Sequence, residues 1–363
     1  MKEFIVKENE QQRLIKLLGK ILSNADNGFL YKMLRKKNIV LNDKKATGNE
    51  SLKTGDSIKI YFSDETFEKL SGNRKTDEAF ISINNKTKKD NAFVLDNNII
   101  YENKDVILIN KPAGILSQKA DKSDTSVVEY LTEYMLSKEQ ITRNELVTFK
   151  PAICNRLDRN TSGIILAGKS LLGLRLLNDI VAKRQIDKYY LTVVKGELTR
   201  KIESDAFLYK DEKNNKVRVF NSLAEAKKVV DNEKKLQNIK TIINPLDRTL
   251  GFTLLEIKLI TGKTHQIRAT MEHLGFPVYG DEKYGKASKV NESGKGSYTD
   301  KFGKNHSSYQ MLHAYKVVFL KEMKELGMNK STYIAKPSKE FTDTLIKIGF
   351  KEERLWDIIK EEA

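Results

Sequence analysis

The sequence has little cysteine and histidine and no long apolar run, and each shortage excludes a class of protein. A single cysteine, Cys154, cannot form an intrachain disulfide framework. With only four histidines beside it, the chain has too few soft ligands for a zinc finger or ribbon, so no metal is expected. No stretch approaches the roughly 18 apolar residues that a membrane span needs, and the charged start MKEFIVKENE does not resemble a signal peptide. We therefore expect a cytoplasmic protein that has no membrane partner.

Positive charge, in contrast, is abundant. The 363 residues include 65 Lys and Arg against 49 Asp and Glu, which gives a net charge of +16 on a chain that is 39% hydrophobic. That apolar content is enough for a folded core, so the charge belongs to a folded protein and not to a disordered basic tail. A basic folded surface attracts phosphate polyanions first, which favours a nucleic-acid partner.

Residues 1–62 have the pattern of a small basic α/β domain. Apolar residues recur at helical spacing over residues 13–22 and 29–34, and strand-like runs follow at residues 39–41 and 56–62. A cluster of basic residues lies between and beside these elements: Lys32, Arg35, Lys36, Lys37, Lys44 and Lys45. By charge alone, this cluster is either a solvated helix face or a nucleic-acid surface.

The order of these elements resembles the S4 RNA-binding domain, in the segments LYKMLRKKNIVLND and LKTGDSIKIYF. The resemblance implies that the six basic residues bind RNA, and it implies nothing about chemistry. Residues 63–92 are polar and rich in Lys, Asn, Asp and Thr, so we expect a linker there with no more than one short strand.

Residues 93–363 lack the steady strand and helix alternation of a parallel α/β fold. The expected strands cover residues 105–110, 189–194 and 252–260 with a hairpin across 207–220, and the expected helices cover residues 171–186 and 338–349. This pattern predicts an α+β domain with a mainly antiparallel sheet. Residues 288–308 are rich in Gly, Ser and Lys, which predicts a loop.

The stretch NRLDRNTSG contains the residue best suited to catalysis. Asp158 lies between Arg156 and Arg159 and leads into an apolar strand at residues 164–167. Flanking arginines favour the charged form of an aspartate, which suits nucleophilic attack or proton abstraction. Without further context, the same residues also describe an aspartate that pairs with an arginine or caps a turn.

The wider stretch NRLDRNTSGIILAGKS resembles the active-site motif R-L-D-x-x-T-S-G of the RluA-type pseudouridine synthases, which holds the catalytic aspartate of that family. Further segments match the family in the expected order: NKPAGILSQ, KYYLTVVKG, LITGKTHQIRATMEHLGFPVYGDEKYG and LHAYKVVF. The resemblance implies a pseudouridine synthase fold for residues 93–363. With the S4-like unit before it, the chain resembles the branch that modifies large-subunit ribosomal RNA.

The resemblance implies a role for four residues. Asp158 becomes the catalytic carboxylate, Tyr190 the aromatic residue that stacks on the base, and Arg268 the basic residue of the active site. Arg156 matches the arginine that enters the RNA helix in place of the extruded base. These roles suit the reaction, because a uridine must leave the stack to expose C1′, C5 and C6, and stacking on a tyrosine offsets part of that cost.

The implied isomerisation is redox-neutral and needs no phosphoryl donor, so neither a cofactor nor a bound nucleotide is expected. The segment TGKT at residues 261–264 lacks the first glycine of a Walker loop, and G-x-G-x-x-G is absent. The main hypothesis is a monomeric enzyme that converts uridine to pseudouridine in 23S ribosomal RNA. Two alternatives stay open: a transfer-RNA pseudouridine synthase of the same family, and a non-catalytic RNA-binding factor in ribosome assembly.

The remaining conspicuous residues are expected to be structural. His265 and His273 are too far apart in the expected elements to share a metal, which favours ordinary hydrogen bonding for both. Cys154 should be a small buried apolar residue, Tyr189 should face away from the site by strand alternation, and Asp281 should be a turn residue.

Overall fold

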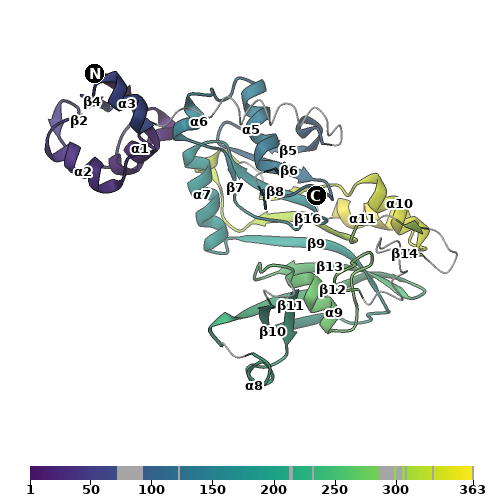
Figure 1. Ribbon diagram of the computed structural model, residues 1–363. Helices are drawn as coiled ribbons and strands as arrows, with labels where there is room; N and C mark the ends of the chain where they lie inside the picture. Colours follow the sequence, from purple (N-terminus) through teal and green to yellow (C-terminus); the bar gives the residue numbers. More distant parts are fainter. Residues whose placement is uncertain are drawn as a thin grey trace.

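The computed structural model describes residues 1–71, 93–121, 123–211, 216–230, 233–285, 298–299, 305–306, 309–328 and 331–361. The predicted turn of the 207–220 hairpin, most of the predicted linker and most of the predicted loop 288–308 lie outside these ranges. The described residues form a small N-terminal unit and a larger domain built on one long sheet (Figure 1). No helix within the described ranges is long and apolar enough to cross a membrane.

The N-terminal unit is a four-stranded antiparallel sheet covered by helices. The strand order is β1 (Lys2–Ile5), β4 (Ser57–Ile60), β2 (Ile39–Leu41) and β3 (Lys44–Lys45), and the helices are α1 (Leu14–Ile21) and α2 (Asn27–Arg35). Asp26 caps α2 by accepting the Phe29 N–H at 2.8 Å. Leucines of both helices pack with Ile39, Ile58 and Ile60 in one core. The two helices and two of the strands agree with the periodicity of the sequence.

A third helix extends this unit beyond residue 62. Helix α3 (Asp64–Ser71) buries Phe67 in the N-terminal core, where its ring stacks on Phe4 at a centroid distance of 5.9 Å. The predicted linker 63–92 therefore starts with a helix of the N-terminal unit. This helix has a weak apolar pattern in the sequence, because Phe67 is the only buried residue of α3.

Polar contacts join the two units. Lys20 donates to the carbonyl oxygen of Thr148 at 2.8 Å, and Lys7 pairs with Glu145 at 3.1 Å, both on helix α6 (Glu145–Thr148). The side-chain oxygen of Asn9 accepts the N–H of Leu171 at 3.2 Å, at the start of helix α7 (Leu171–Ala182).

The larger domain is built on an 11-stranded sheet. Its main strand order is β11 (Lys216–Phe220), β10 (Ile202–Asp211), β12 (Leu236–Thr249), β13 (Phe252–Leu259), β9 (Ile186–Lys195), β16 (Leu312–Phe319), β8 (Ser162–Gly168), β6 (Val106–Lys111) and β5 (Ile99–Glu102). Strand β17 (Thr332–Ile334) pairs with β16, and β7 (Ala152–Ile153) pairs with β8. Among these pairs, only β16 with β8 is parallel. The prediction of a mainly antiparallel α+β domain is confirmed.

Helices cover both faces of this sheet (Figure 1). One face packs against α5 (Val127–Ser137) and α9 (Gln266–His273), and the other against α7, α10 (Lys339–Lys347) and α11 (Glu352–Glu361). A short helix, α8 (Leu223–Lys227), follows β11. Because side chains alternate along β9, Tyr190 faces the α5 and α9 side while Leu191 and Val193 face α10 and α11.

The parallel contact between β8 and β16 depends on a glycine and a buried histidine. A Cβ on Gly163 would lie 2.2 Å from the carbonyl oxygen of Ala314, and the φ of this glycine is +113°. Beside it, His313 Nδ1 lies 2.8 Å from the Ser162 hydroxyl, and its Nε2 lies 3.0 Å from the carbonyl oxygen of Ala335. Burial lowers the pKa of His313 to about 4, although the hydrogen bond to Ala335 opposes that change.

We expect His313 to make the protein sensitive to acid. As the pH falls from 6.5 towards 4, the unfolded chain binds a proton at this side chain while the folded chain does not. The free energy of unfolding should therefore decrease through this window, by no more than about 1.4 kcal/mol per pH unit for one proton. Urea unfolding of the wild type and of His313→Gln, at several pH values across the window, measures the difference. The variant should lose less stability on acidification, and His273→Gln, at a surface histidine, should behave as the wild type.

Candidate active site

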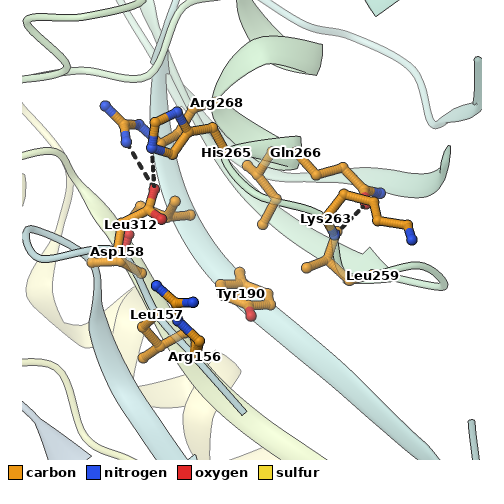
Figure 2. A pocket seen from close by; sticks show the side chains of 12 residues that line it. Arg156, Leu157, Asp158, Tyr190, Leu259, Lys263, His265, Gln266, Arg268 and Leu312 are labelled. Carbon is orange, nitrogen blue, oxygen red and sulfur yellow. Dashed lines mark hydrogen bonds and ion pairs between the residues drawn. The ribbon is translucent and has the colours of Figure 1, made fainter. Parts of the chain in front are cut away.

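A cavity of about 350 Å³ lies where the loop before β8 meets β9 and the start of α9 (Figure 2). It is lined by Arg156, Leu157, Asp158, Thr161, Tyr190, Leu259, Lys263, His265, Gln266, Ile267, Arg268 and Leu312. Many of the same residues line a wider groove of about 1750 Å³ around it.

Asp158 and Arg268 are in direct contact across this cavity. Arg268 Nη1 donates to Asp158 Oδ2 at 2.7 Å, and the Asp158 side chain is 27% exposed. The carboxylate is therefore held in position by a charge-assisted hydrogen bond and is still open to the cavity.

Asp281 fixes the other side of the same guanidinium. Arg268 donates from Nε to Asp281 Oδ2 at 2.6 Å and from Nη2 to Oδ1 at 3.0 Å, and the Asp281 side chain is fully buried. Although burial acts against it, these hydrogen bonds and the charges of Asp281 and Asp158 raise the pKa of Arg268. Two carboxylates thus set the plane and direction of Arg268, which permits no free rotation of its head group.

Asp281 is also the turn residue that the sequence predicted. Its Oδ1 accepts the backbone N–H groups of Lys283 and Tyr284 at 3.0 and 3.1 Å. The sequence reading missed its second role, because nothing in the Gly-Asp step indicates which distant arginine will reach the carboxylate.

Tyr190, which the family resemblance implied as a site residue, forms a wall of the cavity. It is 7% exposed, and burial raises the pKa of its hydroxyl, so the side chain stays protonated. Tyr189 lies on the opposite face of β9, where the ammonium group of Lys316 lies 4.1 Å from its ring centroid. Both orientations agree with the prediction.

Arg156 is exposed and borders the cavity. In Figure 2, Arg156 and Arg268 lie on opposite sides of Asp158. The four site residues taken from the family resemblance, Asp158, Tyr190, Arg268 and Arg156, are therefore gathered around one space although they come from three separate segments of the chain.

His265 also lines the cavity, which the sequence did not predict. Its Nδ1 lies 2.9 Å from the Tyr284 hydroxyl and its Nε2 lies 3.7 Å from Asp158 Oδ2. Burial lowers the pKa of His265. The positive charge of Arg268 lowers it further, while the negative charge of Asp158 raises it. The imidazole therefore favours its neutral form beside the carboxylate. A structural hydrogen bond was expected and is present, but the position of the ring in the cavity was missed.

His273, in contrast, lies 2.9 Å from Asn221 and does not line the cavity. No group of His, Cys, Asp and Glu within the described ranges is arranged to hold a metal ion. Cys154 is partly buried, and burial raises the pKa of its thiol to about 12, which agrees with a packing role and not a nucleophilic one.

Lys111 braces the loop that carries Asp158, a role that no local sequence pattern indicates. The side chain is completely buried, and its ammonium group donates to the carbonyl oxygens of Pro112, Ile115 and Arg159 at 2.8 to 3.0 Å. Burial lowers the pKa of Lys111, while the charge of Asp158 acts in the opposite direction. The three contacts match the three donors of an ammonium group and tie the turn after β6 to the Asp158 loop.

Replacing Lys111 by Met should destabilise the domain by at least about 2 kcal/mol, because buried carbonyl oxygens lose their donor. Urea unfolding monitored by fluorescence measures the change. The matched control is Lys183→Met on the surface of α7, where the lysine pairs with Asp179 and is 59% exposed. That exposed pair should contribute less than about 1 kcal/mol. Equal stability losses in both variants would contradict the bracing role.

The basic cluster of the N-terminal unit lies apart from this cavity. All six residues are exposed, on the last turn of α2, just after it, and on β3. Figure 1 shows α2 and β2 on the side of the N-terminal unit that faces away from the long sheet. None of the six forms an ion pair with another described residue, so their charge is available to a polyanion. RNA binding by them stays a prediction.

The chain is similar to proteins that are described as pseudouridine synthases. The family model RNA pseudouridylate synthase matches residues 105–273. A Mycoplasma genitalium protein described as an uncharacterised RNA pseudouridine synthase is 29% identical over 321 residues, which cover 88% of this chain and 89% of that protein. Ribosomal large subunit pseudouridine synthase C of Rickettsia bellii is 29% identical over 86% of this chain and 90% of its own length.

One further relative matches about half of the chain in sequence, and one solved structure matches about three quarters of it in fold. Ribosomal large subunit pseudouridine synthase D of Borreliella burgdorferi is 35% identical over 190 residues, 52% of this chain and 54% of that protein. Among solved structures, human RNA pseudouridylate synthase domain containing 4 shares the fold, with a TM-score of 0.51 and 16% identity over 75% of this chain and 97% of the human chain.

Proposed function

We propose that this chain, which is similar to RNA pseudouridylate synthases over residues 105–273, isomerises uridines of large-subunit ribosomal RNA with Asp158 as the catalytic carboxylate. The observation that carries the proposal is the cavity in which Asp158, oriented by Arg268, lies beside the ring of Tyr190. The names of the Rickettsia and Borreliella relatives favour ribosomal RNA over transfer RNA as the substrate.

The chemistry requires a uridine that has left its helix. Inside a stacked duplex the bases cover one another, and extrusion costs a few kcal/mol. The ring of Tyr190 would stack on the extruded uracil, and Arg156 at the border of the cavity would occupy the vacated position in the helix.

The reaction breaks the bond from N1 to C1′, rotates the uracil and forms a bond from C5 to C1′. The proton of C5 leaves and N1 gains a proton, so no electrons are exchanged with a cofactor. Asp158 acts either as the nucleophile on the sugar or as a base in a glycal-type route. Both routes need one ionised carboxylate beside C1′, and the hydrogen bond from Arg268 holds the Asp158 carboxylate in position at the cavity.

The N-terminal unit would supply affinity for a large RNA. We assign it to the S4-like RNA-binding type, with the exposed basic residues of α2 and β3 on its RNA-facing side. The full protein is proposed to act in the cytoplasm, as a monomer, on ribosomal RNA or a ribosome precursor.

Tritium release tests the proposal directly. Wild-type protein should release tritium from a ribosomal RNA transcript or ribosome precursor that carries uridine labelled at C5. Mapping of pseudouridines in a strain without the gene should show losses in large-subunit ribosomal RNA. Losses confined to transfer RNA would show that the substrate is transfer RNA and not ribosomal RNA. Intact pseudouridines in the strain, together with no tritium release from any RNA, would contradict the proposed function.

A further inference from the structure

A second depression lies beside the catalytic groove, between β11 and α9. It encloses about 1100 Å³, and its walls carry Lys216 and Arg218 from β11, His273 from α9, and Lys283 and Tyr284 from the segment after Asp281. Lys283 also lines the groove that contains Asp158. The two depressions therefore meet at this lysine, and a chain that leaves the catalytic groove past Lys283 enters the second one. We refer to it below as the β11–α9 cleft.

The charge at this junction is not balanced by the protein. Among the described residues, neither Lys216 nor Lys283 has an ion-pair partner. Burial lowers the pKa of Lys283, and the cations of Arg268 and Lys216 act in the same direction, although Asp158 opposes them. The two carboxylates whose charges act on Lys283, Asp158 and Asp281, are already held by Arg268. Like charges close together destabilise a folded protein unless an anion lies between or across them.

One residue links the floor of the cleft to the catalytic cavity. The hydroxyl of Tyr284 accepts the backbone N–H of Val217 on β11 at 2.9 Å and lies 2.9 Å from His265 Nδ1. Its ring lies 5.1 Å from the guanidinium carbon of Arg268. The cleft is therefore held at a fixed position relative to Arg268 and, through it, to Asp158.

We propose that the β11–α9 cleft binds the sugar-phosphate backbone of the RNA strand next to the target uridine, with Lys283 and Lys216 each contacting a phosphate. This inference rests on the proposed function, because it assumes that the polyanion in the neighbouring groove is RNA. A repeating single negative charge suits two separated ammonium groups, and the cleft is continuous with the cavity that the flipped uridine would occupy. Two carboxylates, Asp211 and Glu272, also line the cleft, but Asp211 lies 3.9 Å from Arg218 and so offsets a different cation. The three cations Lys216, Arg218 and Lys283 still exceed the two carboxylates by one positive charge.

The salt dependence of RNA binding tests the cleft. All measurements use the full chain carrying Asp158→Asn, so that binding is observed without turnover, and a labelled transcript of large-subunit ribosomal RNA as the probe. The double substitution Lys216→Gln with Lys283→Gln should weaken binding at low salt. The slope of log affinity against log salt concentration should become shallower by about 1.4, or about 0.7 for each lost contact to a single strand.

A matched double control makes the same change of charge elsewhere on the sheet. Lys201 and Lys240 are paired with Glu203 and Asp205, each at 2.7 Å, so Lys201→Gln with Lys240→Gln should leave the slope unchanged. Lys216→Arg with Lys283→Arg should retain the original slope, because both positive charges are kept. Thermal melting of every variant shows whether a change in binding follows from unfolding.

Several outcomes would overturn the proposal. One is an unchanged slope in the Lys216 and Lys283 variant, and another is an equal change in the control, which would indicate long-range attraction without contact. Weaker binding to a ribosome precursor with unchanged binding to naked RNA would assign the cleft to a protein partner instead. The proposed function fails separately, if the wild type makes no pseudouridine, and that result does not alter the slope comparison.

Discussion

Asp158→Asn should remove pseudouridine formation while leaving RNA binding nearly unchanged. The amide has almost the same shape and can still accept the hydrogen bond from Arg268, which now spans 2.7 Å. It lacks the negative charge, so it neither attacks the sugar nor removes a proton. We expect the rate to decrease by at least about 10³-fold, near the upper end of what a single acid–base group contributes.

Tritium release under single-turnover conditions measures the rate, and filter binding of the same RNA measures the affinity. The matched control is Asp179→Asn on α7, where the aspartate is 55% exposed and pairs with Lys183. That variant should keep the full rate. If Asp158→Asn retained a tenth of the wild-type rate, the carboxylate would not be the catalytic group and the proposed mechanism would be wrong.

Asp281→Ala should destabilise the protein and also impair catalysis. The substitution leaves the guanidinium of Arg268 buried without the carboxylate that accepts hydrogen bonds from both its Nε and its Nη2. Removal of one member of a buried ion pair costs about 3–5 kcal/mol. It also removes the acceptor for the N–H groups of Lys283 and Tyr284. The activity should decrease because Arg268 no longer holds Asp158 in one orientation.

A double-mutant cycle separates the ion pair from the turn. If Asp281 acts mainly through Arg268, combining Asp281→Ala with Arg268→Met should destabilise the protein by less than the sum of the two single changes. Asp281→Asn keeps an acceptor for the turn and should retain more stability than the alanine variant, yet its activity should remain low. Additive stability losses, or full activity in the asparagine variant, would show that Asp281 has no role in positioning Arg268.

The parts of the fold that the sequence predicted are those with strong local periodicity. The helical spacing before residue 186 corresponds to α7, and the alternating run at residues 252–260 corresponds to β13. Alternation also placed Tyr190 and Tyr189 on opposite faces of β9. In contrast, α3 escaped notice, because a surface helix with one buried residue leaves a weak apolar pattern.

In the candidate site, too, residues within a local motif were predicted, and residues that act through distant contacts were not. Motif order, through the family resemblance, indicated Asp158, Tyr190 and Arg268 in advance. Lys111, His265 and the second role of Asp281 were not predicted, because each depends on groups that are distant in the sequence. Lys111, for example, donates to the carbonyl oxygen of Arg159, 48 positions away.

The amino-acid sequence by itself determined the basic character of this protein, the periodic strands and helices, and the residue types that its chemistry requires, since these follow from composition and from neighbours along the chain. The tertiary structure decided which side chains meet. The buried charges of Lys111, Arg268 and Asp281 are stable only where donors and acceptors converge from separate strands and loops, and that convergence depends on strand order and register. Such long-range geometry leaves no local pattern, so only the folded chain shows how one carboxylate is held open beside an aromatic ring.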